Sequence, residues 1–323
     1  MRSSRSGQLP FRLVQAPRPA AAPPELDPDQ LRVVEHDRGV LRVLAGPGTG
    51  KTTTLVEAAV RRVERGVPVE QLLLLTFSRR AAGQLRDRLT RRLQRTIAEP
   101  VARTFHSYAF GLVRRAAVLA GDPPPRLLSG SEQDVTLREL LAGRLADGVD
   151  EWPPELAAAA TTRAFADELR ELLMRAIERD LWPEDLAALG KRHGRPDWVV
   201  AADVYAEYLD VTALRAPGAF DAPELIQRAV TELVNSPDLL LAERTARRRI
   251  FVDEYQDTDP AQVELLKLLA AGADELVLIG DPDQAIYAFR GAEQNAMAEI
   301  DNHFGSLAGT VKVLPAGGQL ELT

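Results

Sequence analysis

Two kinds of apolar pattern alternate along this chain of 323 residues. Short continuous apolar runs between polar segments are typical of strands that are buried on both faces of a parallel sheet. Such runs occur at residues 40–44, 71–76, 249–252 and 275–279, with two further short ones at 310–314 and 319–323. We therefore predict a parallel sheet whose strands come from both ends of the chain.

Longer segments place apolar residues three or four positions apart, which predicts amphipathic helices. Two of them, 54–63 and 79–95, flank the second predicted strand. The others fill the middle of the chain with no strand among them, and cover residues 107–120, 131–146, 154–180, 183–193 and 197–209. A segment of that length needs packing of its own. The expected fold class is therefore α/β, a parallel sheet with an inserted all-helical subdomain.

These patterns divide the chain into five parts. Residues 1–24, rich in Ser, Arg and Pro, are more typical of a disordered tail than of a transit peptide. The sheet core is expected at 25–106 and 215–300, and the inserted helical domain at 107–214. Residues 301–323 would then begin a second domain or a linker.

The first predicted strand leads into a glycine-rich turn, Ala45-Gly46-Pro47-Gly48-Thr49-Gly50-Lys51-Thr52, and the turn leads into a helix. Glycines let successive backbone N–H groups point at phosphate oxygens, and the helix adds its positive end. Lys51 would reach the β and γ phosphates of ATP, and Thr52 would place its hydroxyl on Mg²⁺. Ala45 departs from the usual first glycine. The alternative is a turn that binds no ligand, but the flanking strand and helix favour a phosphate-binding loop.

Hydrolysis also needs a carboxylate that holds the metal and a group that activates water. Asp253 and Glu254 follow the predicted strand 249–252, at the edge where an open α/β sheet places its ligands. Asp253 would hold Mg²⁺ through water, and Glu254 would act as the general base. Taken alone, such a pair is more often a solvated strand end. Together with the phosphate loop, it favours a catalytic site.

Composition excludes several other classes of site. Cysteine is absent, which rules out disulfides, thiolate catalysis and cysteine-ligated metals, and the four histidines lack metal-ligand spacing. The chain has no apolar run long enough to span a membrane and no secretory leader pattern. We therefore expect a cytoplasmic protein with no membrane partner.

The net charge of −7 argues, on average, against a nucleic-acid partner. Between residues 78 and 115, however, ten arginines are opposed only by Asp87 and Glu99. This basic segment predicts a local track for a phosphate backbone. For the arginines beyond Arg88, a solvated helix face is an equally good interpretation.

Several strings, taken in order, resemble the UvrD/Rep-like superfamily 1A DNA helicases, and the actinobacterial helicase–nuclease motors among them. Asp253-Glu254-Tyr255-Gln256-Asp257-Thr258 is the most specific, followed by Gly280-Asp281-Pro282-Asp283-Gln284 and its continuation to Ala292. The remaining similar strings are residues 26–30, 45–52, 76–82, 104–107 and Phe220-Asp221. The resemblance implies a RecA-like P-loop sheet that binds ATP, Mg²⁺ and single-stranded DNA.

The resemblance also implies roles for individual positions. The catalytic residues would be Lys51, Asp253, Glu254 and Gln284, with Gln284 sensing the γ-phosphate. ATP would contact Gln30, which pairs with the adenine, and Ala45, Gly46, Pro47, Gly48, Thr49, Gly50, Lys51, Thr52 and Thr53. The Mg²⁺ ligands would be Thr52 and Asp253. Single-stranded DNA would contact Phe77, Arg79, Arg80, His106, Tyr287, Phe289 and Arg290, with aromatic rings stacked on bases.

Two features depart from the family pattern. Thr53 stands where many relatives carry an arginine that lies along the adenine. The chain is also shorter than its relatives, in which a second RecA-like domain supplies arginines to the γ-phosphate. We therefore expect a fragment that lacks this second domain in cis, with a helicase or nuclease subunit as a possible partner.

The function implied by the resemblance is the N-terminal half of an ATP-dependent single-stranded DNA translocase or helicase associated with the nucleoid. This chain alone would bind ATP but hydrolyse it slowly. The alternative is a non-motor module that uses ATP as a switch for a protein partner.

Overall fold

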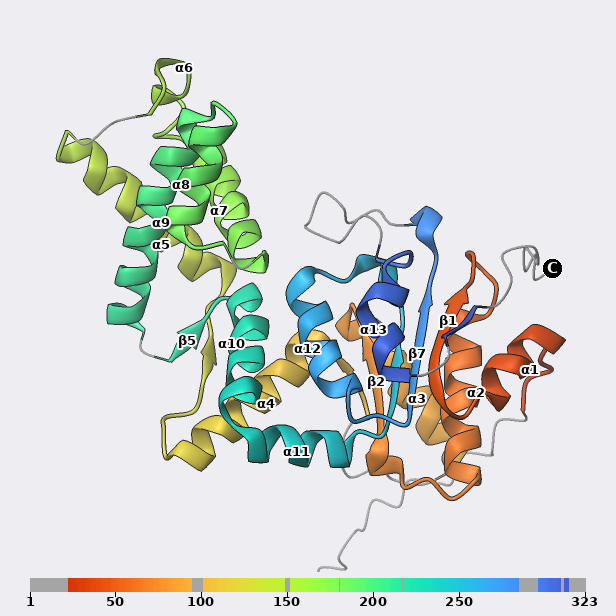
Figure 1. The fold of residues 1–323 in the computed structure, drawn as a ribbon. Helices are drawn as coiled ribbons and strands as arrows, with labels where there is room; N and C mark the ends of the chain where they lie inside the picture. The colour runs from red at the N-terminus through yellow and green to blue at the C-terminus, as the bar shows by residue number, and fades with distance from the viewer. Residues whose placement is uncertain are drawn as a thin grey trace, which may run out of the picture.

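The computed structural model describes residues 23–94, 101–148, 152–179, 181–216, 218–284, 296–308 and 311–313. Two bodies make up these residues: a sheet covered by helices on both faces, and a helical domain beside it (Figure 1). No helix in the described ranges has both the length and the apolar character needed to cross a membrane.

The core is a six-stranded sheet in the order β3-β2-β6-β7-β1-β8, and every neighbouring pair is parallel. Its strands are β1 (Gly39–Leu44), β2 (Leu72–Thr76), β3 (Ala102–Thr104), β6 (Arg249–Val252), β7 (Glu275–Gly280) and β8 (Val311–Val313). The apolar runs at 40–44, 71–76, 249–252 and 275–279 are thus confirmed as strands, and so is the described part of the run at 310–314. The run at 319–323 lies outside the described residues. The sequence pattern missed β3, because three residues with an arginine in the middle leave no apolar run.

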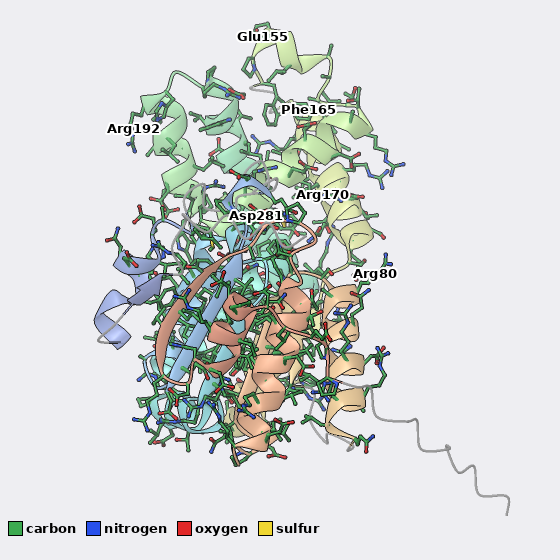
Figure 2. The ribbon with its side chains drawn as sticks, turned by 90° about the vertical axis from the view of Figure 1, so that its right-hand side faces the viewer. Arg80, Glu155, Phe165, Arg170, Arg192 and Asp281 are labelled. Atoms are coloured by element: carbon green, nitrogen blue, oxygen red, sulfur yellow. The ribbon has the colours of Figure 1, made fainter. Side chains whose placement is uncertain are left out.

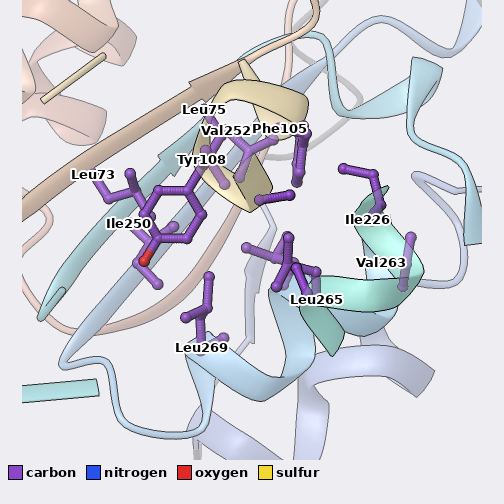
Figure 3. Packing of buried hydrophobic residues seen from close by; sticks show 14 of the residues in the cluster. Leu73, Leu75, Phe105, Tyr108, Ile226, Ile250, Val252, Val263, Leu265 and Leu269 are labelled. Carbon is purple, nitrogen blue, oxygen red and sulfur yellow. The ribbon is translucent and has the colours of Figure 1, made fainter. Parts of the chain in front are cut away.

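Alternate strand residues face opposite sides, and both sides are buried. On one face, Leu73, Leu75, Ile250 and Val252 pack against helices that include α4 (Figure 3). The helices of this face are α4 (Phe105–Ala120), α10 (Ala222–Asn235), α11 (Pro237–Ala246), α12 (Pro260–Ala270) and α13 (Ile300–Ala308). This double burial explains why the strands read as continuous apolar runs.

The opposite face of the sheet carries Leu72, Leu74 and Phe251. It is covered by α1 (Pro28–Glu35), α2 (Lys51–Glu64) and α3 (Arg79–Leu93). The core therefore has three layers, and the loops that follow the strands emerge between them at one edge.

The helical domain has its own apolar cluster, built around Leu137, Leu173 and Tyr208. Its helices are α5 (Gly130–Ala146), α6 (Pro154–Ala157), α7 (Arg163–Glu178), α8 (Pro183–Arg192) and α9 (Pro196–Arg215). A single helix over 154–180 was a wrong prediction. The chain turns after α6, and the Thr162 side chain caps a new helix by accepting a hydrogen bond from the Phe165 N–H.

Helix α4 packs with the sheet, although residues 107–214 are expected above as the inserted domain. Tyr108, Ala109 and Leu112 lie in the same cluster as the strand residues of the first face. The chain then enters the helical domain through β4 (Arg126–Leu127) and leaves it through β5 (Ala219–Phe220). These two short strands pair in parallel, so the entry and exit of the domain lie side by side.

Candidate nucleotide and DNA site

The described site residues other than Gln30 follow the carboxyl ends of parallel strands, so they share one edge of the sheet. The strand order places the DNA-side residues after β3 and β2, and the nucleotide-side residues after β6, β7 and β1. Figure 2 shows Asp281, which follows β7, on the side of the core that faces the helical domain. Residues distant in the sequence thus form two adjoining halves of one edge.

The phosphate loop takes the backbone shape that its glycines predict. Gly50 has a φ of 76°, in the left-handed region, and α2 begins at the next residue, Lys51. A Cβ atom at position 50 would lie 2.7 Å from Nε2 of Gln30. That amide donates to the carbonyl oxygen of Thr49 at 3.2 Å, so Gln30 is held against the loop. Inside the loop, Thr49 Oγ1 donates to the Gly46 carbonyl oxygen at 2.8 Å.

The structure brings Lys51 and Glu254 together. Lys51 Nζ lies 2.9 Å from Glu254 Oε2, and the Lys51 side chain is only 10% exposed. Glu254 has a φ of 55°, which is unusual for a residue with a side chain and is typical of functional sites. Gln256 Nε2 donates to the same carboxylate oxygen at 2.8 Å. The amine of the phosphate loop and the expected general base therefore form one polar group.

Asp253 is buried beside this pair. Burial and, next, the charge of Glu254 raise its pKa to about 6, while Lys51 opposes the shift. Its Oδ1 atom is buried and accepts no hydrogen bond. An unsatisfied carboxylate oxygen next to the loop of Thr52 is the kind of ligand that Mg²⁺ prefers, so the donor set fits this metal. The described ranges contain no cluster of three or more His, Asp and Glu side chains that could hold a metal ion.

A hydrogen-bonded chain links Glu254 to Gln284. Gln256 Oε1 accepts from the backbone N–H of Asp281 at 3.0 Å, and Gln284 Nε2 donates to Asp281 Oδ2 at 2.5 Å. A Cβ atom on Gly280 would lie 2.5 Å from Gln256 Oε1, so the glycine makes room for this chain. The sequence analysis missed the linking role of Asp281. Its signals were the position directly after an apolar strand and its place in the string Gly280-Asp281-Pro282-Asp283-Gln284.

On the predicted DNA side, Phe77 is half-buried, and Arg79 and Arg80 are exposed at the start of α3. Figure 2 shows Arg80 there. His106 lies at the start of α4, and its pKa is lowered by burial and by the charge of Arg79. These four residues are near one another because β2 and β3 are neighbours in the sheet. Tyr287, Phe289 and Arg290 lie outside the described residues.

Part of the basic segment binds the protein itself. Arg92 forms two hydrogen bonds of 2.7 Å with the Glu57 carboxylate, and Arg86 donates to the Ala102 carbonyl oxygen at 2.9 Å. Arg88 Nη1 lies 3.5 Å from the hydroxyl of Thr53, at the edge of the nucleotide half. Helix α3 therefore uses several arginines for packing, and its first residues remain the best placed for a phosphate backbone.

The structure buries Asp221, which belongs to the string Phe220-Asp221 that resembles the family. Its side chain is 1% exposed and accepts hydrogen bonds from Tyr208 at 2.9 and 3.0 Å and from Gln133 at 2.5 Å. Both donors belong to the helical domain, whereas Asp221 begins α10 of the core. This carboxylate joins the two bodies and does not face a solvent-borne ligand.

Comparisons with known proteins agree with this geometry. The family described as "UvrD/REP helicase N-terminal domain" matches residues 26–305. "ATP-dependent DNA helicase UvrD1" of Mycobacterium tuberculosis (strain ATCC 25618 / H37Rv) is 32% identical over 290 residues, which cover 86% of this chain and 36% of that protein. "DNA helicase II" of Escherichia coli (strain K12) is 29% identical over 281 residues, with 86% and 36% covered. The chain thus spans about a third of the length of these relatives.

Proposed function

Because the chain belongs to the UvrD/REP helicase family, we propose that it forms the N-terminal ATP- and DNA-binding half of an ATP-dependent DNA helicase. The observation that carries this proposal is the contact between Lys51 and Glu254, with the unsatisfied Asp253 beside it, on the edge that also bears Arg79 and Arg80. A nucleotide and a single strand of DNA would then bind to adjoining parts of one sheet.

Each nucleotide-side residue has a distinct task in this proposal. Gln30 reads the adenine, and the loop from Ala45 to Thr53 surrounds the phosphates with backbone N–H groups. Lys51 neutralises the phosphate oxygens. Thr52 and Asp253 hold Mg²⁺, which supplies charge stabilisation for phosphoryl transfer when it is bound. The buried, unsatisfied oxygen of Asp253 supports this assignment.

Glu254 would take a proton from the attacking water. In the structure its carboxylate is tied to the Lys51 ammonium and the Gln256 amide through Oε2. While this pair persists, two donors occupy Glu254 Oε2, and the oxygen is less accessible to the attacking water. A phosphate chain that attracts Lys51 would release Glu254, and nucleotide binding would then prepare the base.

The chain of Gln256, Asp281 and Gln284 offers a link between this event and DNA. Gln284 would sense the γ-phosphate, and its hydrogen bond to Asp281 would pass a movement on to Gln256 and Glu254. Single-stranded DNA would contact the residues that follow the neighbouring β-strands β2 and β3, namely Phe77, Arg79, Arg80 and His106. Tyr287, Phe289 and Arg290 stay predicted DNA contacts. A second RecA-like domain, a partner subunit and a nucleoid location belong to the same proposal.

The test measures nucleotide and DNA affinity separately. We expect a fluorescent ATP analogue to bind the chain with Mg²⁺, and a labelled oligothymidylate to bind with a salt dependence typical of phosphate contacts. The double variant Arg79→Ala/Arg80→Ala should reduce the slope of log K against log salt by about 1.4, which is the loss of two single-strand phosphate contacts. Its affinity for ATP should be unchanged.

The matched control is Arg163→Ala/Arg192→Ala, which removes the same charge from exposed positions of the helical domain. An equal reduction of the salt slope for DNA binding in the two double variants would contradict the proposed DNA track. A chain that binds ATP but no single-stranded DNA at low salt would instead support the ATP-switched module.

A further inference from the structure

The nucleotide half depends on an arginine that lies far from the phosphates. Arg62, on the last turn of α2, is 1% exposed and is among the largest fully buried side chains of the described residues. Its Nε donates to Glu275 Oε2 at 2.9 Å and its Nη2 to Glu275 Oε1 at 2.5 Å. Glu275, the first residue of β7, is also fully buried. Desolvation of such a pair costs several kcal/mol, so the pair needs further hydrogen bonds.

Those further bonds come from α1. Arg62 Nη1 donates to the carbonyl oxygen of Val34, and Nη2 donates to that of His36. Val34 belongs to the last turn of α1, and His36 is its C-cap. The last carbonyl groups of a helix have no partner within the helix and carry its negative end. Arg62 therefore acts as a C-terminal cap that another helix supplies.

The other end of α1 carries the adenine-reading residue. Asp27 and Gln30 form a reciprocal capping box there, in which the Asp27 N–H donates to Gln30 Oε1 at 3.1 Å. The second polar atom of the same amide, Nε2, holds the Thr49 carbonyl oxygen. Helix α1 has eight residues and is about 12 Å long, so a shift at its C-terminal end moves Gln30 as well.

Other contacts of α1 position it less strictly. Arg61 and Arg65 reach Glu35 on the surface, where ion pairs contribute little. Val33 and Val34 pack in the second apolar cluster, but apolar contacts permit a helix to slide or rotate. The Arg62 hydrogen bonds are directional, and they fix both the depth and the rotation of the helix beside α2 (Figure 1).

We propose that Arg62 is a positioning residue for base selection. Through α1 it holds Gln30 in register with the phosphate loop, and its loss lowers discrimination between adenine and guanine nucleotides while phosphate binding persists. The proposal rests on the proposed function, because it assumes that the loop binds a nucleoside triphosphate.

The main test uses the double variant Arg62→Leu/Glu275→Leu, which removes both charges and leaves neither one buried alone. Affinities for ATP, GTP and inorganic tripolyphosphate are measured with Mg²⁺, together with the melting temperature. We expect the ratio of ATP to GTP affinity to fall about tenfold, as for the loss of one hydrogen bond, with tripolyphosphate affinity unchanged. Arg61→Ala, at the neighbouring exposed position, should leave the ratio as in the parent chain.

A second variant keeps the test decisive if the double variant does not fold. Arg62→Lys retains the charge beside Glu275 but cannot donate to both carbonyl groups of α1 at once. It should lower the same ratio, and it should have no further effect when Gln30→Ala is already present. An unchanged ratio in a folded variant overturns the proposal, and so does a parent chain that binds ATP and GTP equally. If the parent chain does not bind tripolyphosphate at all, the proposed function itself is refuted.

Discussion

The two ends of the parallel sheet treat buried polar groups in opposite ways. At the amino end, Glu275 is fully paired by Arg62. Beside this pair, the partly exposed Arg248 binds the Asp274 carboxylate, with Nε and Oδ2 3.1 Å apart, and the Gly272 carbonyl oxygen at 2.7 Å. At the carboxyl end, Oδ1 of Asp253 and Oγ1 of Thr76 are buried without a hydrogen bond, and Glu254 has left-handed backbone geometry.

This difference suggests that polar groups at the amino end serve stability and those at the carboxyl end serve ligand binding. Both oxygens of the Glu275 carboxylate are paired with Arg62, which leaves no capacity for a ligand, so this pair can only fix the positions of strands and helices. Oxygens without a hydrogen bond and a strained residue at the carboxyl end reduce stability. Such groups are typical of sites where a bound ligand supplies the missing interactions. We therefore expect substitutions of the paired charges at the amino end to act first on unfolding, and substitutions of the charged side chains at the carboxyl end to act first on binding.

The largest effect is expected from Glu275→Gln. The change leaves the Arg62 guanidinium buried without a counter-charge, which should lower the free energy of unfolding by about 3–5 kcal/mol. Urea denaturation measures it. Glu64→Gln is the control, because Glu64 is exposed and lies 3.7 Å from Arg61 in a surface pair. Equal effects of the two substitutions would contradict a stabilising role for the amino end.

Lys51→Ala should give the reverse result at the carboxyl end. Loss of the ammonium should weaken binding of ATP with Mg²⁺ about 100-fold, the range for a largely buried charge, with little change in unfolding. Titration with a fluorescent ATP analogue measures the affinity. Lys267→Ala, which breaks a surface pair with Glu264, should change neither quantity. A Lys51 variant that unfolds as readily as Glu275→Gln would erase the contrast between the two ends.

Gly280→Ala tests the polar chain at the end of β7. The new methyl group would lie 2.5 Å from Gln256 Oε1 and 2.8 Å from Met297 Sδ, so Gln256 must move away from Asp281. We expect a loss of about 1–3 kcal/mol in unfolding, as for overpacking of a core. Gly305→Ala on α13 meets no atom within 4 Å and should be neutral or slightly stabilising. Equal stability of both variants would show that the crowding at Gly280 relaxes freely.

The smallest effect concerns pH. Burial raises the pKa of Asp259, the N-cap of α12, to about 6. In the unfolded chain the pKa of an aspartate is about 3.9. Between these two pH values the folded chain therefore binds more protons than the unfolded chain. Stability from this group therefore falls as pH rises through that window. Asp259→Asn keeps an N-cap acceptor and should flatten the dependence by about 1 kcal/mol, measured as unfolding free energy at pH 4.5 and 6.5. A slope equal to that of the parent chain would show that Asp259 does not cause this pH dependence.

Local motifs, and their meeting at the carboxyl edge of the sheet, were predictable from sequence, whereas a buried ion pair outside the motifs was not. The phosphate loop, Asp253 and Glu254 follow directly from a strand, a turn and a helix that adjoin in sequence. The meeting of Lys51 with Glu254 could be expected, because parallel strands share one carboxyl edge. The pairing of Arg62 with Glu275 could not, since no motif marks either residue and both look like ordinary surface charges. The packing of α4 on the sheet was missed for a related reason: helical periodicity shows a buried face but not its partner.

The parallel pairing of β4 with β5 bears on how this protein could have changed during evolution. The backbone N–H of Arg126 donates to the Gly218 carbonyl oxygen at 2.9 Å, and that of Leu128 donates to the Phe220 carbonyl oxygen at 2.9 Å. The points where the chain enters and leaves the helical domain are therefore neighbours. A gene segment encoding a helical domain of another size could be exchanged between these points while the six strands keep their order. The nucleotide half and the helical module can thus accumulate substitutions at independent rates, with Asp221 and its two partners as the positions that must change together.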